Sequence, residues 1–235
     1  MDKSPFSDNN VRMAMKLAMD RGETNEKSDF NAGTVGNDFH FSPKTSDYTE
    51  WLEQRVHDPD KAKWHLKQAG MDSLEANMWA SDSVQPGAVD FVTLYAEQAE
   101  AAGINITPVR ESGDGHWADV WLKKPFMFSS CGGRPTPDVI FSLTYQTGAA
   151  WSEAFRSNAR FDELLLPAKA ELDVGLRAEK YRETCMIARD DGGSIVPHFT
   201  NYVYAHLDTI GRPDVVGNTW EFDGAFGYQR CWFKS

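Results

Sequence analysis

Residues Ser129–Phe141 read SSCGGRPTPDVIF, a sequence that joins a short apolar segment to a loop rich in glycine and proline. The preceding segment, Phe126–Ser129, is apolar and aromatic, which predicts a buried strand that enters the loop. The loop, Cys131–Asp138, contains two glycines that let backbone N–H groups approach a ligand and two prolines that stiffen it. A stiff glycine loop carrying Arg134 after a strand is typical of a ligand site in an α/β protein, and a structural turn is the alternative.

The candidate ligand-binding residues in this loop are consecutive, and Asp138 after them is expected to cap a helix over Val139–Tyr145. They are Cys131, Gly132, Gly133, Arg134, Pro135 and Thr136.

Composition limits the possible functions of the chain. It has 235 residues, of which 41% are hydrophobic, and 24 basic residues against 35 acidic ones give a net charge of −11. Nucleic acid and anionic membrane surfaces are therefore poor partners. The first residues, MDKSPFSDNN, lack the apolar segment of a secretory signal, and no run is long enough to span a membrane. Three cysteines without CxxC spacing exclude a zinc knuckle, and we expect no metal, cofactor or catalytic residue.

Helical periodicity and punctuation predict three helices in the first half of the chain. The first covers Asn9–Asp20 with Asp8 as its N-cap, and an irregular excursion follows over Gly22–Tyr48. The second covers Asp58–Gly70, with a capping aspartate, a proline at its first position and a glycine past its end. The third covers Ala88–Ala102.

Two predicted strands flank the third helix. Leu74, Ala76 and Met78 alternate as in a half-buried strand, and Ile104–Val109 forms the other after the helix-stopping glycine Gly103. Strand, helix and strand in succession indicate an α/β unit with a parallel pair. The predicted fold class is α/β, with a mixed sheet flanked by helices.

Further elements are expected along the second half of the chain. They are a short helix over Ala118–Lys123, a helix over Phe161–Leu172 kinked or split at Pro167, a helix over Leu176–Asp190, and strands at Ile195–Pro197 and Val203–Ala205. The final stretch, Asn218–Ser235, carries many aromatic residues without helical period. We expect it to pack on another surface rather than remain in water.

Two helical stretches, Phe6–Arg21 (FSDNNVRMAMKLAMDR) and Asp58–Gly70 (DPDKAKWHLKQAG, with His65 in place of a leucine), carry a family resemblance. They are similar to two helices of the family of extracellular solute-binding proteins of peptide- and nickel-type ABC importers. Ala101–Ile106 (AAGINI) resembles its G-I-x-V strand, and Cys131–Phe141 occupies the place of its ligand-facing W-x-G-D loop.

The resemblance implies one lobe of a two-lobed periplasmic-binding-protein-like (class II) fold. In the family, the segment like Phe6–Arg21 lies mid-chain, so residues 1–198 are expected to form the second ligand-binding lobe. Residues 199–235 are expected to cross back towards a first lobe that precedes this sequence. The family is exported, so the resemblance implies a periplasmic protein whose signal peptide is absent from this fragment.

One departure from the family concerns the charge of the loop. Peptide-binding members have a tryptophan and, three residues later, an aspartate that pairs with the ligand's α-ammonium group. The corresponding positions here are Cys131 and Arg134. A guanidinium suits carboxylate or phosphate, so the solute is expected to be a peptide or an anionic or polyhydroxylated compound. Arg134 facing solvent or pairing with a nearby aspartate is the alternative.

Other candidates for the cleft are Trp117, Asn37 and Phe39. Trp117 is either a cleft aromatic or a core residue, and Asn37–Phe39 either reach the cleft or form a turn.

We expect a non-enzymatic binding protein, monomeric at full length, that delivers solute to ABC permease subunits. The alternatives are a hydrolase that uses Cys131 as nucleophile and an interaction module that uses the aromatic C-terminal segment.

Overall fold

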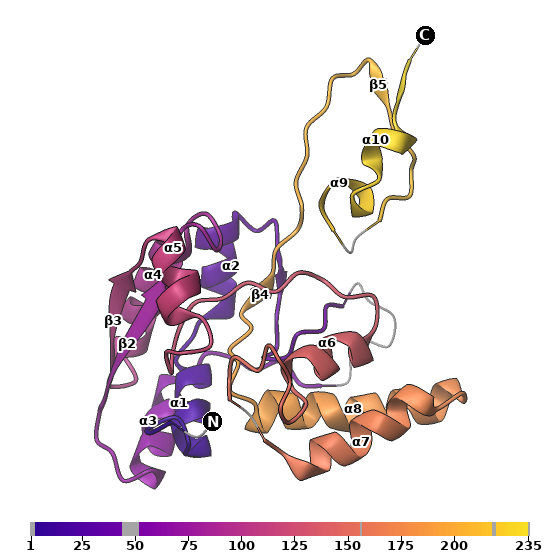
Figure 1. The fold of residues 1–235 in the computed structure, drawn as a ribbon. Helices are drawn as coiled ribbons and strands as arrows, with labels where there is room; N and C mark the ends of the chain where they lie inside the picture. Colours follow the sequence, from indigo (N-terminus) through magenta and orange to yellow (C-terminus); the bar gives the residue numbers. More distant parts are fainter. Residues whose placement is uncertain (1–2, 44–51, 156, 218–219, 235) are drawn as a thin grey trace.

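The computed structural model describes residues 3–43, 52–155, 157–217 and 220–234. Figure 1 shows one group of elements built from α1, α3, α4 and two long strands, a second group built from α6, α7 and α8, and a C-terminal segment that projects away from both. Within these ranges, no helix has the length and apolar character needed to cross a membrane.

The two best-punctuated helices form, although the first ends at Leu17 and not at the predicted Asp20. Helix α1 covers Asn9–Leu17, and the Asp8 side chain accepts a hydrogen bond from the backbone N–H of Asn10. Helix α3 covers Pro59–Gln68, with Asp58 accepting from the backbone N–H of Lys61. Apolar residues of both helices are fully buried in one core, so the sequence signals of capping and periodicity are confirmed.

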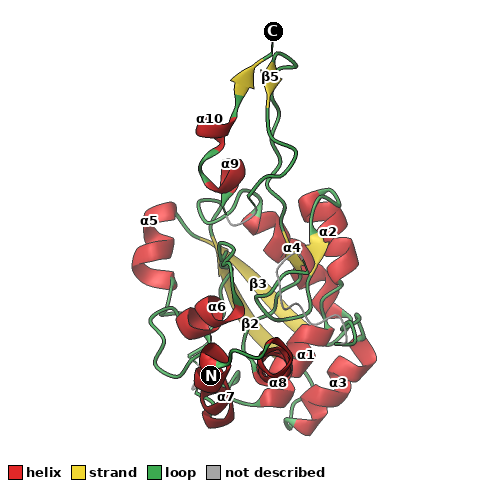
Figure 2. Ribbon diagram, turned by 90° about the vertical axis from the view of Figure 1, so that its right-hand side faces the viewer, coloured by secondary structure: helices red, strands yellow, loops and turns green. Residues whose placement is uncertain are grey.

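The predicted strand–helix–strand unit is also confirmed. Strands β2 (Leu74–Ala80) and β3 (Ile104–Arg110) pair in parallel, and α4 (Ala88–Glu100) connects them and packs on the pair. Figure 2 shows the two strands side by side between helices. Trp79 forms a parallel bridge with Met127, which adds the segment before the central loop to this sheet. Of the predicted buried strand Phe126–Ser129, only Phe128 is buried, and a single bridge replaces a full strand.

Helices α6 (Pro137–Thr144), α7 (Ala159–Ala170) and α8 (Val174–Asp191) build a second core. The prediction that Asp138 caps α6 is wrong, because Pro137 takes the first turn and Thr136 becomes the N-cap. The predicted split at Pro167 does not occur, since buried residues on both sides of it hold α7 against α8.

Helix α2 (Arg21–Asp29) was not predicted and lies inside the expected irregular excursion. Its residues are polar on every face, so it carries no apolar periodicity. The Asp20 side chain accepts from the backbone N–H of Glu23 and starts the helix. Strand β1 (Thr34–Val35) follows and pairs antiparallel with β4 (His198–Phe199). The last residues of the predicted excursion, 44–48, lie outside the described residues.

Three smaller predictions need correction. The expected helix Ala118–Lys123 instead begins earlier, as a short turn of α5 (Gly113–Gly115) that continues into a π-helix, η1 (His116–Val120). Ile195–Pro197 and Val203–Ala205 are not strands; the strand of this region is β4, between them, because β1 offers its edge there. The described part of residues 199–235 forms, after β4, α9 (Glu221–Gly224), α10 (Gly227–Arg230) and the antiparallel pair of β5 (Ile210–Gly211) and β6 (Trp232–Phe233).

A buried charge network joins the two cores. Asp38 is fully buried, and Nη2 of Arg21 donates to both of its carboxylate oxygens at 2.7 Å. Arg55 forms an ion pair with Asp38 at 2.8 Å and donates to Asp190 at the end of α8 at 2.9 Å. Lys16, fully buried on α1, donates to the carbonyl oxygens of Arg189 and Gly192. These contacts fix α1 and α2 against the end of α8.

Candidate functional site

The central loop lies beside the carboxyl ends of the parallel strands. The bridge between Trp79 and Met127 sets the direction of the chain that enters the loop, and Ser130 Oγ donates to the carbonyl oxygen of Val84 at 3.4 Å. A polar hollow at these strand ends is lined by residues 81–83 and 110–113, with Arg110 and Asp82 paired at 3.1 Å. Ligands of α/β proteins bind at this edge of a sheet.

Arg134 is half-buried and held in a fixed position by its own loop and by two indole rings. Its Nη1 donates to the carbonyl oxygens of Gly132 at 2.8 Å and Gly133 at 3.0 Å. Its guanidinium lies 5.9 Å from the ring centre of Trp151 and 5.6 Å from that of Trp220. These two cation–aromatic contacts order the side chain, and no carboxylate among the described residues forms an ion pair with it.

A series of tryptophans extends from Arg134 across the site. Trp151 contacts Trp121 edge to face at 6.1 Å between ring centres, and Trp121 contacts Trp117 in the same way at 5.7 Å. Trp117 is 50% exposed and Trp151 is 41% exposed. The structure therefore places Trp117 at the open end of an aromatic wall and not in either core.

Glu153 is the acidic member of the site. Its Oε1 accepts hydrogen bonds from Trp121 Nε1 at 2.8 Å and from Ser129 Oγ at 2.6 Å. These two bonds connect the π-helix, the start of the loop and the segment after α6. The arrangement brings a carboxylate into the same aromatic site as the guanidinium of Arg134.

Cys131 is an exposed free thiol. Desolvation by the surrounding loop raises the pKa of Cys131, Glu153 adds to the rise, and Arg134 opposes it. Its hydrogen bond goes to the carbonyl oxygen of Gly132, at 3.8 Å, and in the described ranges no histidine contacts it. A thiol with a raised pKa and no base beside it is a poor nucleophile.

The other predicted site residues divide into two groups. Gly133 and Pro135 are exposed at the surface of the loop, and Thr136, the N-cap of α6, is partly buried. Asn37 and Phe39 lie elsewhere: the Asn37 side chain is buried among hydrogen bonds to Glu53, Arg55 and Arg189, and Phe39 is buried in the second core. The structure does not bring Asn37 or Phe39 to the loop.

Sequence reasoning missed four residues of this site, namely Trp121, Trp151, Glu153 and Trp220. Trp121 and Trp151 were visible only as aromatic residues, and Trp220 belonged to the final stretch, which was expected to pack on another surface. Glu153 carried no signal, because its two donors lie far away in the sequence. Among the described residues, no group of three or more histidine, cysteine and carboxylate side chains is arranged to hold a metal ion.

Comparison with known proteins gives three concordant findings. The family described as bacterial extracellular solute-binding proteins, family 5 (middle part), matches residues 1–153. The dipeptide-binding protein of Escherichia coli (strain K12) is 22% identical over 207 residues, which cover 83% of this chain and 38% of that protein.

Solved structures share the fold. The ABC transporter-associated periplasmic binding protein DppA from Helicobacter pylori, in complex with the peptide STSA, has a TM-score of 0.79 at 18% identity. The match covers 99% of this chain and 45% of that one. NikZ from Campylobacter jejuni, in complex with Ni(L-His), has a TM-score of 0.75 at 17% identity over 85% of this chain and 43% of that one. The chain thus spans less than half the length of these relatives.

Proposed function

The chain belongs to the bacterial extracellular solute-binding proteins of family 5, and we propose that it works outside the cytoplasm, where it captures a small polar solute and delivers it to an ABC permease. The observation that carries this proposal is the site itself: a stiff loop, an ordered guanidinium and a half-exposed aromatic wall meet at the carboxyl edge of a parallel strand pair. Such a wall with a few fixed polar groups is typical of a small-molecule site.

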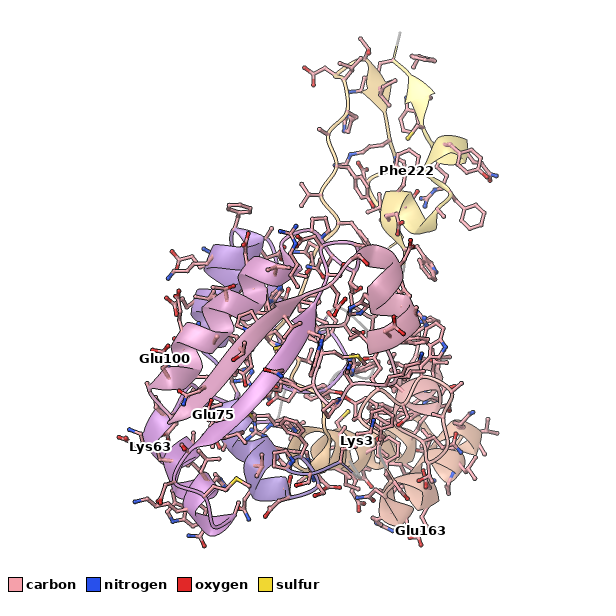
Figure 3. The ribbon with its side chains drawn as sticks, turned by 60° about the vertical axis from the view of Figure 1, so that its left-hand side comes forward. Lys3, Lys63, Glu75, Glu100, Glu163 and Phe222 are labelled. Carbon is pink, nitrogen blue, oxygen red and sulfur yellow. The ribbon has the colours of Figure 1, made fainter. Side chains whose placement is uncertain are left out.

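The proposed division of the chain puts the site in one lobe. We propose that residues 1–198 form the second ligand-binding lobe and that residues 199–235 cross back towards a first lobe. The C-terminal segment supports this division, because it projects from the body with its large side chains uncovered, as Figure 3 shows around Phe222. Its exposed apolar and aromatic residues include Leu207, Val215, Trp220, Phe222, Phe226, Tyr228, Trp232 and Phe233.

The proposed solute contacts come from residues 131–136 and Trp117. Arg134 presents a charge that its own loop carbonyls only partly engage, so a carboxylate, phosphate or polyhydroxylated group of the solute binds there. The aromatic wall covers the apolar part of the solute. Closure of the two lobes then excludes water from these contacts.

The proposal describes a binding protein and not an enzyme. Among the described residues no histidine contacts Cys131 to act as its base, which speaks against the hydrolase alternative. Alkylation of this thiol tests that alternative, since a thiol hydrolase loses all activity on alkylation. The other alternative is an interaction module built on residues 199–235. Sedimentation of the full-length protein with and without these residues tests it, and a complex that forms only when they are present would favour the module.

Native mass spectrometry of the full-length protein, purified without denaturation, tests solute capture. By full-length protein we mean this chain joined to its proposed first lobe. The expected result is a protein peak carrying a small bound solute that is released on unfolding. Consistently empty protein, together with no binding to any peptide of a defined panel, would contradict the proposal.

A further inference from the structure

Three oxygen atoms converge beside Gly33, where α2 meets β4. A methyl group built on this glycine would lie 2.4 Å from Asp29 Oδ2, 2.5 Å from Asn25 Oδ1 and 3.0 Å from the carbonyl oxygen of Phe199. Only a glycine lets the chain pass so close to these atoms. Figure 1 shows β4 next to α2, at the point where the C-terminal segment leaves the body.

Two of these three oxygens are buried acceptors without a donor. Asn25 is only 7% exposed, and neither its Oδ1 nor Asp29 Oδ2 accepts a hydrogen bond from the described part of the chain. Buried polar atoms in folded proteins almost always have a partner. Two orphaned oxygens that point to one place therefore indicate a positively charged group that the chain does not itself supply.

The three oxygens are the kind of ligands that a calcium ion takes. Ca²⁺ binds carboxylate, side-chain amide and backbone carbonyl oxygens, and water completes its coordination. Asp29 Oδ2 and Asn25 Oδ1 are no more than about 5 Å apart, which two oxygens bound at about 2.3–2.6 Å to one Ca²⁺ ion can span. The Phe199 carbonyl oxygen has two lone pairs, so it can serve an ion and the strand pairing at once.

The end of α2 also favours a cation. The helix ends at Asp29, so the negative end of its dipole lies at the three oxygens. The turn that brings Gly33 back to the helix is held by backbone hydrogen bonds from Asn31 to the Asn25 carbonyl at 3.0 Å and from Ala32 to the Asp29 carbonyl at 2.7 Å. The oxygens are thus held together by the fold and not by the ion alone.

From this arrangement we propose that Asn25, Asp29 and the carbonyl oxygen of Phe199 bind a Ca²⁺ ion, which ties α2 to the start of residues 199–235. The site lies apart from the glycine loop and does not rest on the proposed function. With one carboxylate among its ligands, its dissociation constant is expected at about 10⁻⁴–10⁻³ M. The proposal departs from the sequence expectation of no metal, because an amide and a backbone oxygen leave no ligand motif.

The alternative is an internal hydrogen bond, with the Asn25 amide turned so that its Nδ2 donates to Asp29 Oδ2. Asn25→Asp separates the two cases. A second carboxylate strengthens a Ca²⁺ site, since affinity rises with ligand charge, but it removes the donor of an internal hydrogen bond. Asp29→Asn removes the charged ligand, and Glu26→Gln is the matched control, because Glu26 is an exposed carboxylate on the same helix.

The experiment is calorimetric titration of the chelator-treated full-length protein with CaCl₂ at constant ionic strength. We expect saturable binding in the unmodified protein, weakening by about tenfold or more in Asp29→Asn, tighter binding in Asn25→Asp and no change in Glu26→Gln. MgCl₂ is expected to bind more weakly, because Mg²⁺ demands a near-ideal octahedral set of ligands.

Hydrogen–deuterium exchange of the unmodified protein locates the ion without any variant. Slower exchange in Ca²⁺ is expected in the fragments that cover residues 25–36 and 198–201. If Asp29→Asn is poorly folded, this measurement decides, and unchanged exchange in both fragments would overturn the inference.

Three other results would overturn it while leaving solute capture intact. One is the lack of saturable Ca²⁺ binding up to about 10 mM, above the range of weak extracellular sites. Another is equal weakening by Asp29→Asn and Glu26→Gln, which would mean attraction to the acidic surface. The third is tighter binding of Zn²⁺ than of Ca²⁺, which would assign the ion to a nitrogen ligand such as His198, whose Nδ1 is also buried without a partner among the described residues.

Discussion

Replacing Asp38 by asparagine removes the central anion of the buried network and keeps the shape of the side chain. In the folded protein the Asp38 carboxylate receives Arg21 Nη2 at 2.7 Å on both oxygens, Arg55 at 2.8 Å, and the backbone N–H of Val196 at 3.2 Å. Burial alone raises the pKa of Asp38, but Arg21, Lys16 and Arg55 outweigh it and hold that pKa below its ordinary value.

The expected loss of stability is large. Removing one partner of a buried ion pair leaves uncompensated charge and costs about 3–5 kcal/mol. A domain is stable by only about 5–15 kcal/mol, so the variant retains a small margin or unfolds. With a urea m-value of about 2 kcal/mol/M, the unfolding midpoint falls by about 2 M.

Urea unfolding followed by tryptophan fluorescence measures this loss, with Glu163→Gln as a control that changes the free energy of unfolding by less than about 1 kcal/mol. Because the folded pKa of Asp38 is lowered, its contribution is present above the unfolded pKa and is lost as pH falls through the folded one. Stability of the variant is therefore expected to depend less on acidic pH. A loss below about 1 kcal/mol at neutral pH would refute the role assigned to the network.

Three further predictions concern Lys16, the separate lobe and Arg134. Burial lowers the pKa of Lys16 from 10.5 to about 7, so between these pH values the unfolded chain holds a proton that the folded chain lacks, and the free energy of unfolding rises with pH. Lys16→Met is expected to remove up to about 1.4 kcal/mol per pH unit of that rise. Urea unfolding at about pH 7.5 and 9.5 measures it, and an equal change in the free energy of unfolding between the two pH values in the variant and the unmodified protein would contradict the prediction. Residues 1–235 alone are expected to bind solute at least about a hundredfold more weakly than the full-length protein, since half of the contacts are missing, and equal calorimetric affinities would argue against two lobes. Arg134→Ala in the full-length protein is expected to weaken an anionic or zwitterionic solute by about 2–5 kcal/mol in the same assay, whereas unchanged affinity of Arg134→Asp would show that the side chain does not face the solute.

Local signals in the sequence predicted much of the fold. The caps Asp8 and Asp58 and the glycine stop at Gly103 act through neighbouring backbone atoms, so they are visible without tertiary information. The parallel pairing of β2 with β3 follows from the helix between them. Helix α2 escaped prediction because its cap and its packing on α4 stabilise it, and neither leaves an apolar period in the sequence.

The candidate site was predictable only in part. The glycine loop and Trp117 were identified from local composition and from family resemblance. The partners of Arg134 were not, because Trp151 and Trp220 reach it from distant segments. Asn37 looked like a polar loop residue, but its amide is used inside the network that joins the cores. Whether a polar residue faces solute or structure depends on contacts that no local pattern encodes.

Hydrogen–deuterium exchange of the full-length protein, with and without the solute that co-purifies with it, tests the location of the binding site most directly. The site proposed here predicts slower exchange on binding in the fragments that cover residues 129–136, with smaller protection over 116–121 and 151–153. Protection confined to other parts of the chain, with exchange in residues 129–136 unchanged, would contradict the central claim that this loop and its tryptophan wall hold the solute.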